Sequence, residues 1–189
     1  MADNACERSV PFEHRPASRH TYATLPRHSL ILCASLVHNP ANLGGLCRLA
    51  EVFRLECLMM SSLAIAQDAA FRKTAVSAHH WQPMMACTPH ELPTRFDHYR
   101  QQNYQVIGLD STQHTTPITS FAFPKQAILL LGQELTGLPT PIIEQCDQVV
   151  TIPQYGLVES LNVQHAGAIA IYEYLKQHVD SPDSHKDTL

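Results

Sequence analysis

Short, continuous apolar runs recur along the chain and constrain its fold more than any other feature. Such runs are typical of strands that are buried on both faces of a parallel sheet. Between them lie segments with helical periodicity, such as residues 42–53, which place Leu46, Leu49, Ala50 and Phe53 on one face. Strands that alternate with helices predict an α/β domain with a mostly parallel sheet flanked by helices. The predicted strands cover residues 30–37, 55–60, 104–110, 127–132 and 148–152.

The predicted helices carry recognisable start signals. Thr88, Pro89 and Glu91 have the spacing of a capping box with proline at the first helical position, and Pro93 should end or kink the helix that follows. A short helix is expected over residues 138–146. The last helix, residues 161–178, has a wide apolar surface, made of Ala166, Ala168, Ile169, Ile171, Tyr172 and Leu175.

A length of 189 residues and an apolar fraction of 44% suit one globular domain, predicted over residues 29–178. Residues 1–28 are polar and carry several prolines and arginines, which predicts a flexible arm. Whether this arm is a solvated tail or an RNA-contacting segment stays open. Residues 179–189 are expected to form a disordered tail.

Composition also excludes several classes of protein. No apolar run reaches the roughly 18 residues needed to cross a bilayer, and the N-terminus lacks the apolar stretch of a secretory signal. The six cysteines form no CxxC pair, and four of them lie in apolar runs: Cys33, Cys47, Cys57 and Cys87. These features predict reduced core thiols, no zinc site and a cytoplasmic location.

The formal net charge of −4 gives no overall signature of a nucleic-acid-binding protein. An RNA surface therefore has to be a local patch of cations. The candidates are Arg48, Arg54, Arg72 and Lys73.

Three segments that follow predicted strands combine glycine with polar or charged residues. They are HNPANLGGLCRLAEVF after residues 30–37, LLLGQELTGLP in and after 127–132, and IPQYGLVESLN from the end of 148–152. Open α/β sheets bind ligands at the carboxyl ends of their strands, and glycine lets a backbone approach a ligand closely. Each segment alone also fits a helix start, a turn or a loop, but the three together favour a ligand site.

The three segments resemble the motifs of the SpoU-type (TrmH-like) RNA ribose 2'-O-methyltransferases of the SPOUT superfamily. The first resembles N-x-G-x-x-x-R, through Asn42, Gly44 and Arg48. The second resembles G-x-E-x-x-G-[IL], through Gly132, Glu134, Gly137 and Leu138. The third and most specific resembles I-P-x-x-G-x-x-x-[SE]-[LM]-N, through Ile152, Pro153, Gly156, Ser160, Leu161 and Asn162. Order and spacing agree over about residues 29–178.

The resemblance implies more than the apolar pattern does. It implies a deep trefoil knot near the C-terminus, an obligate homodimer, and S-adenosylmethionine as co-substrate, without a metal. The loop from Ile152 to Leu161 would wrap the adenine of that co-substrate. The cofactor-binding residues implied are Leu109, Gly132, Ile152, Gly156 and Leu161.

The family assigns the central catalytic role to the arginine of the first motif, here Arg48. Because an arginine pKa lies above about 12, the side chain stays protonated and is a poor base. An alternative is that Arg48 binds the target phosphate, and that the phosphate or a water accepts the proton. Asn42 would orient Arg48 or the ribose. Glu134 would position Arg48 or a backbone group, or would simply be an acid at a helix N-terminus. Ser160 and Asn162 would hold the nucleotide, or would simply be helix N-caps.

The RNA substrate is the most open part of the prediction. The segment KTAVSAHHW, with ATLPRH upstream, is closest to the branch that methylates guanosine 18 in the tRNA D-loop. The chain departs from the family at Gln133, where asparagine is usual, and at Gln164 and His165. An rRNA methyltransferase, a catalytically silent RNA-binding dimer and an unrelated ligand-binding α/β domain stay open as alternatives.

Overall fold

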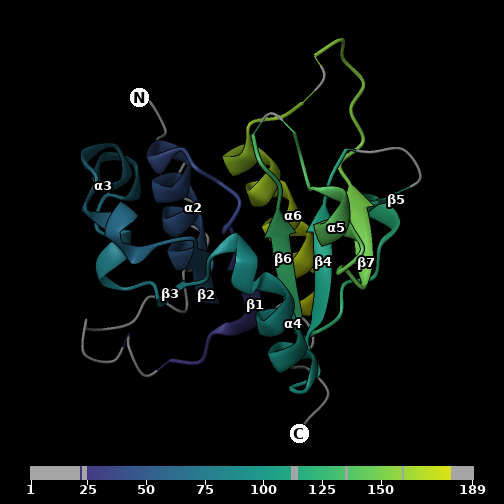
Figure 1. Ribbon diagram of the computed structural model, residues 1–189, viewed down its shortest axis with the longest axis horizontal. Helices are drawn as coiled ribbons and strands as arrows, with labels where there is room; N and C mark the ends of the chain where they lie inside the picture. The colour runs from purple at the N-terminus through teal and green to yellow at the C-terminus, as the bar shows by residue number, and fades with distance from the viewer. Residues whose placement is uncertain (1–21, 23–24, 112–114, 135, 159, 180–189) are drawn as a thin grey trace, which may run out of the picture.

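The computed structural model describes residues 22, 25–111, 115–134, 136–158 and 160–179. Its centre is a seven-stranded sheet with the order β3-β2-β1-β6-β4-β7-β5 (Figure 1). Every pairing in the sheet is parallel, which confirms the predicted α/β class. The strands are β1 His28–Cys33, β2 Leu55–Met60, β3 Met84–Ala86, β4 Gln105–Leu109, β5 Thr116–Pro117, β6 Ala127–Leu131 and β7 Gln148–Thr151.

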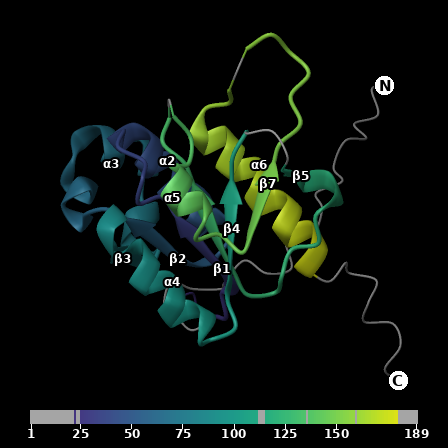
Figure 2. The ribbon, with the colours of Figure 1, turned by 45° about the vertical axis from the view of Figure 1, so that its right-hand side comes forward.

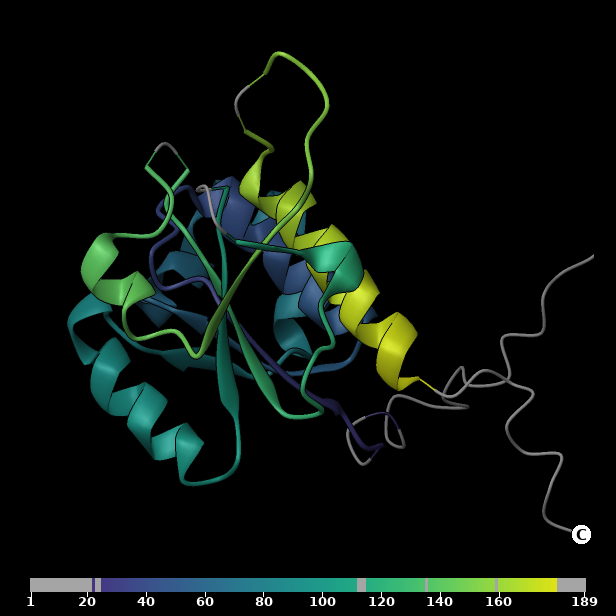
Figure 3. The same ribbon diagram turned by 90° about the vertical axis from the view of Figure 1, so that its right-hand side faces the viewer.

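Helices cover both faces of the sheet, as Figure 3 shows. On one face α2 (Pro40–Val52), α3 (Ala69–Ala75) and α6 (Val163–His178) share a core with the strands. On the other face α4 (Leu92–Arg100) and α5 (Thr140–Ile143) close a second apolar cluster. Single 3₁₀ turns occur at η1 Leu63–Gln67, η2 Ala78–His80, η3 Pro89–Glu91 and η4 Ile118–Ser120. Among the described residues no helix is both long and apolar enough to span a membrane.

The first predicted strand is too long. β1 ends at Cys33, and residues 34–37 form a turn whose backbone bonds run from Ala34 N to Met59 O (2.9 Å) and from Val37 N to Ala34 O (3.1 Å). Residues 34–37 are all buried, and three of them are apolar, so they resemble a buried strand in sequence. Apolar sequence alone therefore could not locate the strand end.

The predicted capping box is confirmed, but the role of the following proline is wrong. Glu91 Oε2 accepts a bond from Thr88 N (2.7 Å), and this box starts the turn η3. Pro93 lies in the first turn of α4, where the missing N–H has no intrahelical partner to lose. It therefore helps to begin a helix instead of ending one.

The two glycines of the first motif serve helix packing. We expected Gly44 to mark the close approach of a ligand, but both glycines lie inside α2. A Cβ on Gly44 would lie 2.2 Å from the Phe71 carbonyl oxygen of α3, and a Cβ on Gly45 would lie 1.9 Å from the side-chain oxygen of Gln164 in α6. The glycines therefore let α2 touch two other helices at once.

The residues just before β1 are attached to the domain. Arg27 donates hydrogen bonds to the carbonyl oxygens of Leu55 (3.0 Å) and Trp81 (2.9 Å). Arg54 donates to the carbonyl oxygens of Leu25 and Pro26, near the amino ends of the strands. It therefore does not lie with the carboxyl ends, where a ligand was expected. The rest of the predicted arm, residues 1–21 and 23–24, and residues 180–189 of the predicted tail lie outside the described residues.

The predicted core thiols are confirmed. Cys33, Cys47, Cys57 and Cys87 are buried and free. Burial raises the pKa of Cys33, Cys47 and Cys57 to about 12, so these thiols stay protonated near neutral pH and contribute as apolar groups.

We predict that Gly44→Ala destabilises the fold and that Gly156→Ala does not. Overpacking typically costs about 1–3 kcal/mol, and the alanine's helix preference regains about 1 kcal/mol at most. The atom in the way at Gly44 is a backbone oxygen, which cannot rotate aside, whereas nothing lies within 4 Å of a Cβ at Gly156. Urea unfolding of both variants measures the difference, and equal stabilities would contradict this packing role.

Candidate active site

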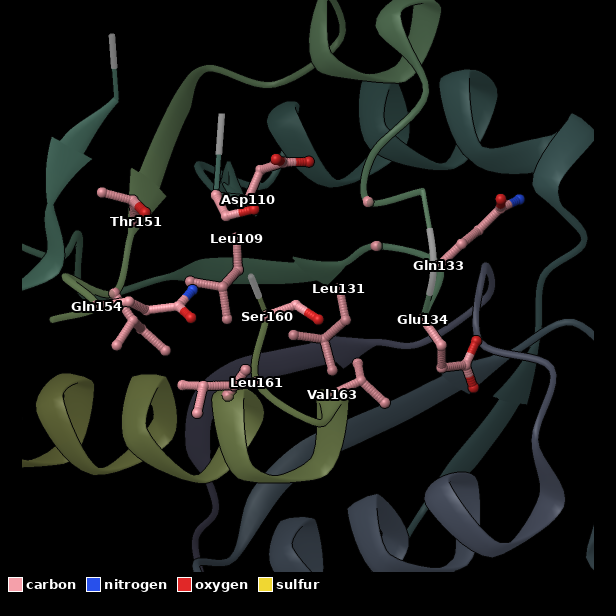
Figure 4. Close-up of a pocket in the computed structure, with 15 residues that line it drawn as sticks. Leu109, Asp110, Leu131, Gln133, Glu134, Thr151, Gln154, Ser160, Leu161 and Val163 are labelled. Carbon is pink, nitrogen blue, oxygen red and sulfur yellow. The ribbon is translucent and has the colours of Figure 1, made fainter. Parts of the chain in front are cut away.

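A cavity of about 290 Å³ opens at the carboxyl ends of β4, β6 and β7 (Figure 4). Its size lies near the lower end for small-molecule sites. Four of the predicted cofactor-binding residues line it: Leu109, Gly132, Ile152 and Leu161. Of the predicted catalytic residues, Glu134 and Ser160 line it as well. The structure thus gathers residues from the second and third motifs, together with Leu109, around one space.

Gly156 lies apart from this cavity. It belongs to the loop between β7 and α6, which rises beyond the strand ends in Figure 2. Gly156 is exposed, and it is absent from the cavity lining. The same loop exposes three large apolar side chains almost completely: Tyr155 (97%), Leu157 (103%) and Val158 (77%).

A chain of hydrogen bonds links the three motifs beside the cavity. Asn162 Nδ2 donates to Asn42 Oδ1 (3.0 Å), and Asn42 Nδ2 donates to Glu134 Oε1 (3.3 Å). The same carboxylate oxygen accepts a bond from the backbone N–H of Asn39 (3.2 Å). Each predicted residue therefore restricts the rotation of the next one.

Helix caps fix both ends of this chain. Asn162 is the N-cap of α6, and its Oδ1 accepts a bond from Gln164 N (2.9 Å), so the capping hypothesis is confirmed for Asn162. Ser160 precedes the cap and lies on the cavity wall instead. At α2 the cap is Asn39, which accepts from Ala41 N (2.9 Å). Asn39 was missed, although asparagine followed by proline is a recognised helix start.

Glu134 is held as a carboxylate. Burial raises the pKa of Glu134, but hydrogen bonds from its own backbone N–H, from the Asn42 side chain and from the backbones of Asn39 and His38 outweigh that effect. The pKa of Glu134 therefore lies below its usual value. The hydrogen-bond partners are neutral groups, so of the two partners expected for Glu134 the structure shows the backbone group and, among the described residues, no bond to Arg48.

Asp110 is a buried carboxylate that sequence reasoning missed. It follows β4, is only 8% exposed, and its Oδ2 accepts the backbone N–H of Leu138 (2.6 Å). Gly137 has a φ of +67°, and a Cβ there would lie 2.8 Å from Asp110 Oδ2. Two backbone bonds between Gln133 and Gly137 close the turn that carries Glu134. An aspartate directly after a buried strand was the available signal.

Arg48 is exposed on α2 and is absent from the cavity lining. Within the part of the chain that the structure describes, its guanidinium has no hydrogen bond or ion pair. Asn42, which was expected to orient Arg48 or the ribose, contacts Glu134 and Asn162 and has no hydrogen bond to Arg48 among the described residues. Arg48 therefore presents an uncommitted cation to solvent.

The described residues contain no group of three or more histidine, cysteine or acidic side chains that could hold a metal ion. The cavity walls are aliphatic side chains and backbone, with a few hydroxyl, amide and carboxylate groups. This composition suits an organic ligand with an apolar ring and a few polar groups.

The class of fold and the three linked motifs agree with the comparisons to known proteins. The model of the SpoU rRNA Methylase family matches residues 29–172, so the chain belongs to this family, as its motifs indicated.

Two similar relatives are tRNA (guanosine(18)-2'-O)-methyltransferases. The mouse protein, TARBP1, is 40% identical over 148 residues, which cover 78% of this chain and 9% of the relative. The protein of Saccharomyces cerevisiae is 33% identical over 154 residues, which cover 81% of this chain and 11% of the relative. The chain thus spans about a tenth of the length of these relatives.

A solved structure has the same fold. The SpoU methyltransferase AviRb from Streptomyces viridochromogenes, in complex with the cofactor AdoMet, superposes with a TM-score of 0.69 at 22% identity. The match covers 88% of this chain and 64% of that one.

We predict that Glu134→Gln lowers the free energy of unfolding by about 0.5–1 kcal/mol at pH 7. A hydrogen bond to a charged acceptor is stronger than one to a neutral acceptor, and the half-exposed site reduces the difference. Because the folded-state pKa of Glu134 is depressed, its contribution is present above the ordinary value of 4.5 and is lost as pH falls through the folded-state pKa. Urea unfolding of both proteins over a pH series measures this, and a difference that grows on acidification would contradict the assignment.

Proposed function

We propose that the chain is an S-adenosylmethionine-dependent RNA ribose 2'-O-methyltransferase that acts on tRNA, at a guanosine of the D-loop. The observation that carries this proposal is the hydrogen-bonded chain Glu134–Asn42–Asn162, which joins the three family motifs beside a ligand-sized cavity. The names of the mouse and yeast relatives support tRNA as substrate. An rRNA substrate, after which the family is named, is the second candidate.

The cavity fits S-adenosylmethionine, which supplies an activated methyl group when it is bound. Leu109, Ile152 and Leu161 provide apolar walls for the adenine ring. Backbone groups of Gly132, Ile152 and Leu161 are the hydrogen-bonding partners that we assign to its polar edge. The AdoMet complex of the structurally similar AviRb supports this choice of co-substrate. We propose that no metal takes part.

The chain's own residues must position a ribose and handle one proton. A 2'-hydroxyl is a weak nucleophile and has to lose its proton as the new bond forms. Arg48 binds the target phosphate and stabilises developing charge, and the phosphate or a water on it accepts the proton. Asn42 and Asn162, which hold one another, and the Ser160 hydroxyl on the cavity wall position the nucleotide.

The proposed architecture includes the knot. The start of α6 is bonded to α2 through Asn162 and Asn42. Its last turns are bonded to the segment between β5 and β6: Gln177 Nε2 donates to Phe121 O (3.0 Å), and Tyr174 OH donates to Lys125 O (2.7 Å). These contacts hold both ends of α6 against the domain, and the knot itself is proposed from the family resemblance. We retain residues 29–178 as the methyltransferase domain and the cytoplasm as the location.

The decisive experiment is methyl transfer from labelled S-adenosylmethionine to bulk tRNA and, separately, to rRNA. We expect label in tRNA, recovered as 2'-O-methylguanosine after nuclease digestion. Label in rRNA alone would favour the second candidate. RNA binding without transfer would leave a catalytically silent RNA-binding dimer. Calorimetry of co-substrate binding with and without a chelator tests the metal-free proposal.

We predict that Arg48→Ala slows methyl transfer by roughly 10²–10⁴-fold and leaves S-adenosylmethionine binding nearly unchanged. Arg48 is outside the cavity lining, so the co-substrate loses no contact. Arg48→Lys should restore little, because a point ammonium lacks the planar fork that grips phosphate. Single-turnover rates at saturating RNA and co-substrate measure the step. A wild-type rate combined with weaker RNA binding would reduce Arg48 to a phosphate contact.

We predict a homodimer, with a mass in light scattering about twice the 21.1 kDa of one chain. The outer face of α6 leaves Ile169 (42%) and Tyr172 (63%) exposed, which favours burial against a second copy. Tyr172→Asp should yield monomers, since a buried carboxylate at an interface is costly. Val52→Asp changes a similarly exposed residue (60%) at the end of α2 and should remain dimeric. A wild-type monomer that still methylates RNA would refute the dimer.

A further inference from the structure

Gln154 brings an amide group to the cavity that none of the roles assigned above uses. It lies in the loop after β7, between Pro153 and Tyr155, and it lines the cavity. Figure 4 shows its carboxamide directed into the cavity, toward the side on which Leu109 and Ser160 lie. Among the described residues the carboxamide has no hydrogen-bond partner. Its donor and acceptor are therefore available to a ligand.

A second glutamine on the same cavity provides a contrast. Gln133 also lines the cavity, but its Oε1 accepts the hydroxyl of Thr136 (2.5 Å). Figure 4 shows the Gln133 side chain directed away from the cavity. The two glutamines therefore share chemistry and location, and they differ in whether the amide faces a ligand.

The surroundings of Gln154 suit the edge of a flat heteroaromatic ring. Leu109 from the end of β4 and Leu161 from the segment before α6 are apolar walls of the same cavity. A ring held between apolar walls presents only its edge to polar groups. A carboxamide offers one donor group beside one acceptor, which is the complement of the amino group and neighbouring ring nitrogen of adenine.

We infer that Gln154 is a specificity-determining residue that recognises the 6-amino edge of the purine in the co-substrate. Its Oε1 accepts a hydrogen bond from the amino group, and its Nε2 donates to the adjacent ring nitrogen. This inference rests on the proposed function, because the purine is that of S-adenosylmethionine. It adds a side-chain contact to the backbone contacts described above, and this contact distinguishes adenine from purines without the amino group.

The test compares two ligands on three proteins by calorimetry. The ligands are S-adenosylhomocysteine, which keeps the adenosine of the co-substrate, and its analogue with hydrogen in place of the 6-amino group. The proteins are the wild type, Gln154→Leu and the matched control Gln133→Leu. The ratio of the two affinities in each protein isolates the amino-group contact from changes common to both ligands.

We expect Gln154→Leu to lower this affinity ratio by roughly tenfold, the size of one lost specific contact to a base edge. Gln133→Leu should keep the wild-type ratio. Gln154 is exposed, so its variant should unfold at the wild-type temperature. An unchanged ratio in Gln154→Leu, or an equal fall in both variants, would overturn the inference while leaving the proposed function intact. Failure of the wild type to bind S-adenosylhomocysteine would instead count against the proposed function, and the inference would fall with it.

Discussion

The site depends on the two hydrogen bonds that the Asn42 side chain makes with Asn162 and Glu134. The three residues come from the start of α2, the cap of α6 and the turn after β6, which are far apart in the sequence. An amide has one donor group and one acceptor, so Asn42 can satisfy both neighbours at once. A change at any one of the three residues leaves a partner unsatisfied, and the motifs therefore form one unit.

Close helix packing is what brings these groups within reach. α2 meets α6 at Gly45, where the Gln164 side chain takes the space of a Cβ. Three residues further along α6 the roles reverse, because a Cβ on Gly167 would lie 2.9 Å from Leu46. Larger residues at either glycine would push the two helices apart. The bond of 3.0 Å between Asn162 and Asn42 needs this separation, so glycines that never face a ligand still determine the geometry of the site.

Sequence patterns predicted those features that depend on neighbouring residues. Continuous apolar runs located five of the strands, and the Thr88–Glu91 spacing located a helix start. The patterns failed where distant segments decide the outcome. β5 has two residues and forms only because β7 lies beside it. The role of Asp110 depends on Leu138 N, twenty-eight positions away, and no local pattern reports such a contact. The family motifs identified the site residues, but they did not indicate that Asn42 links the motifs by hydrogen bonds.

The separation of Glu134 from Arg48 has a consequence for the proposed mechanism. Glu134 takes its hydrogen bonds from neutral amides, although a cation, Arg48, stands on the same helix as Asn42. An ion pair between Glu134 and Arg48 would commit the guanidinium, and a phosphate would then have to displace a carboxylate before it could bind. Satisfying Glu134 with backbone and asparagine N–H groups avoids that competition. The carboxylate can thus order the asparagines while the arginine stays available to an anionic substrate. Neither charged group has to neutralise the other.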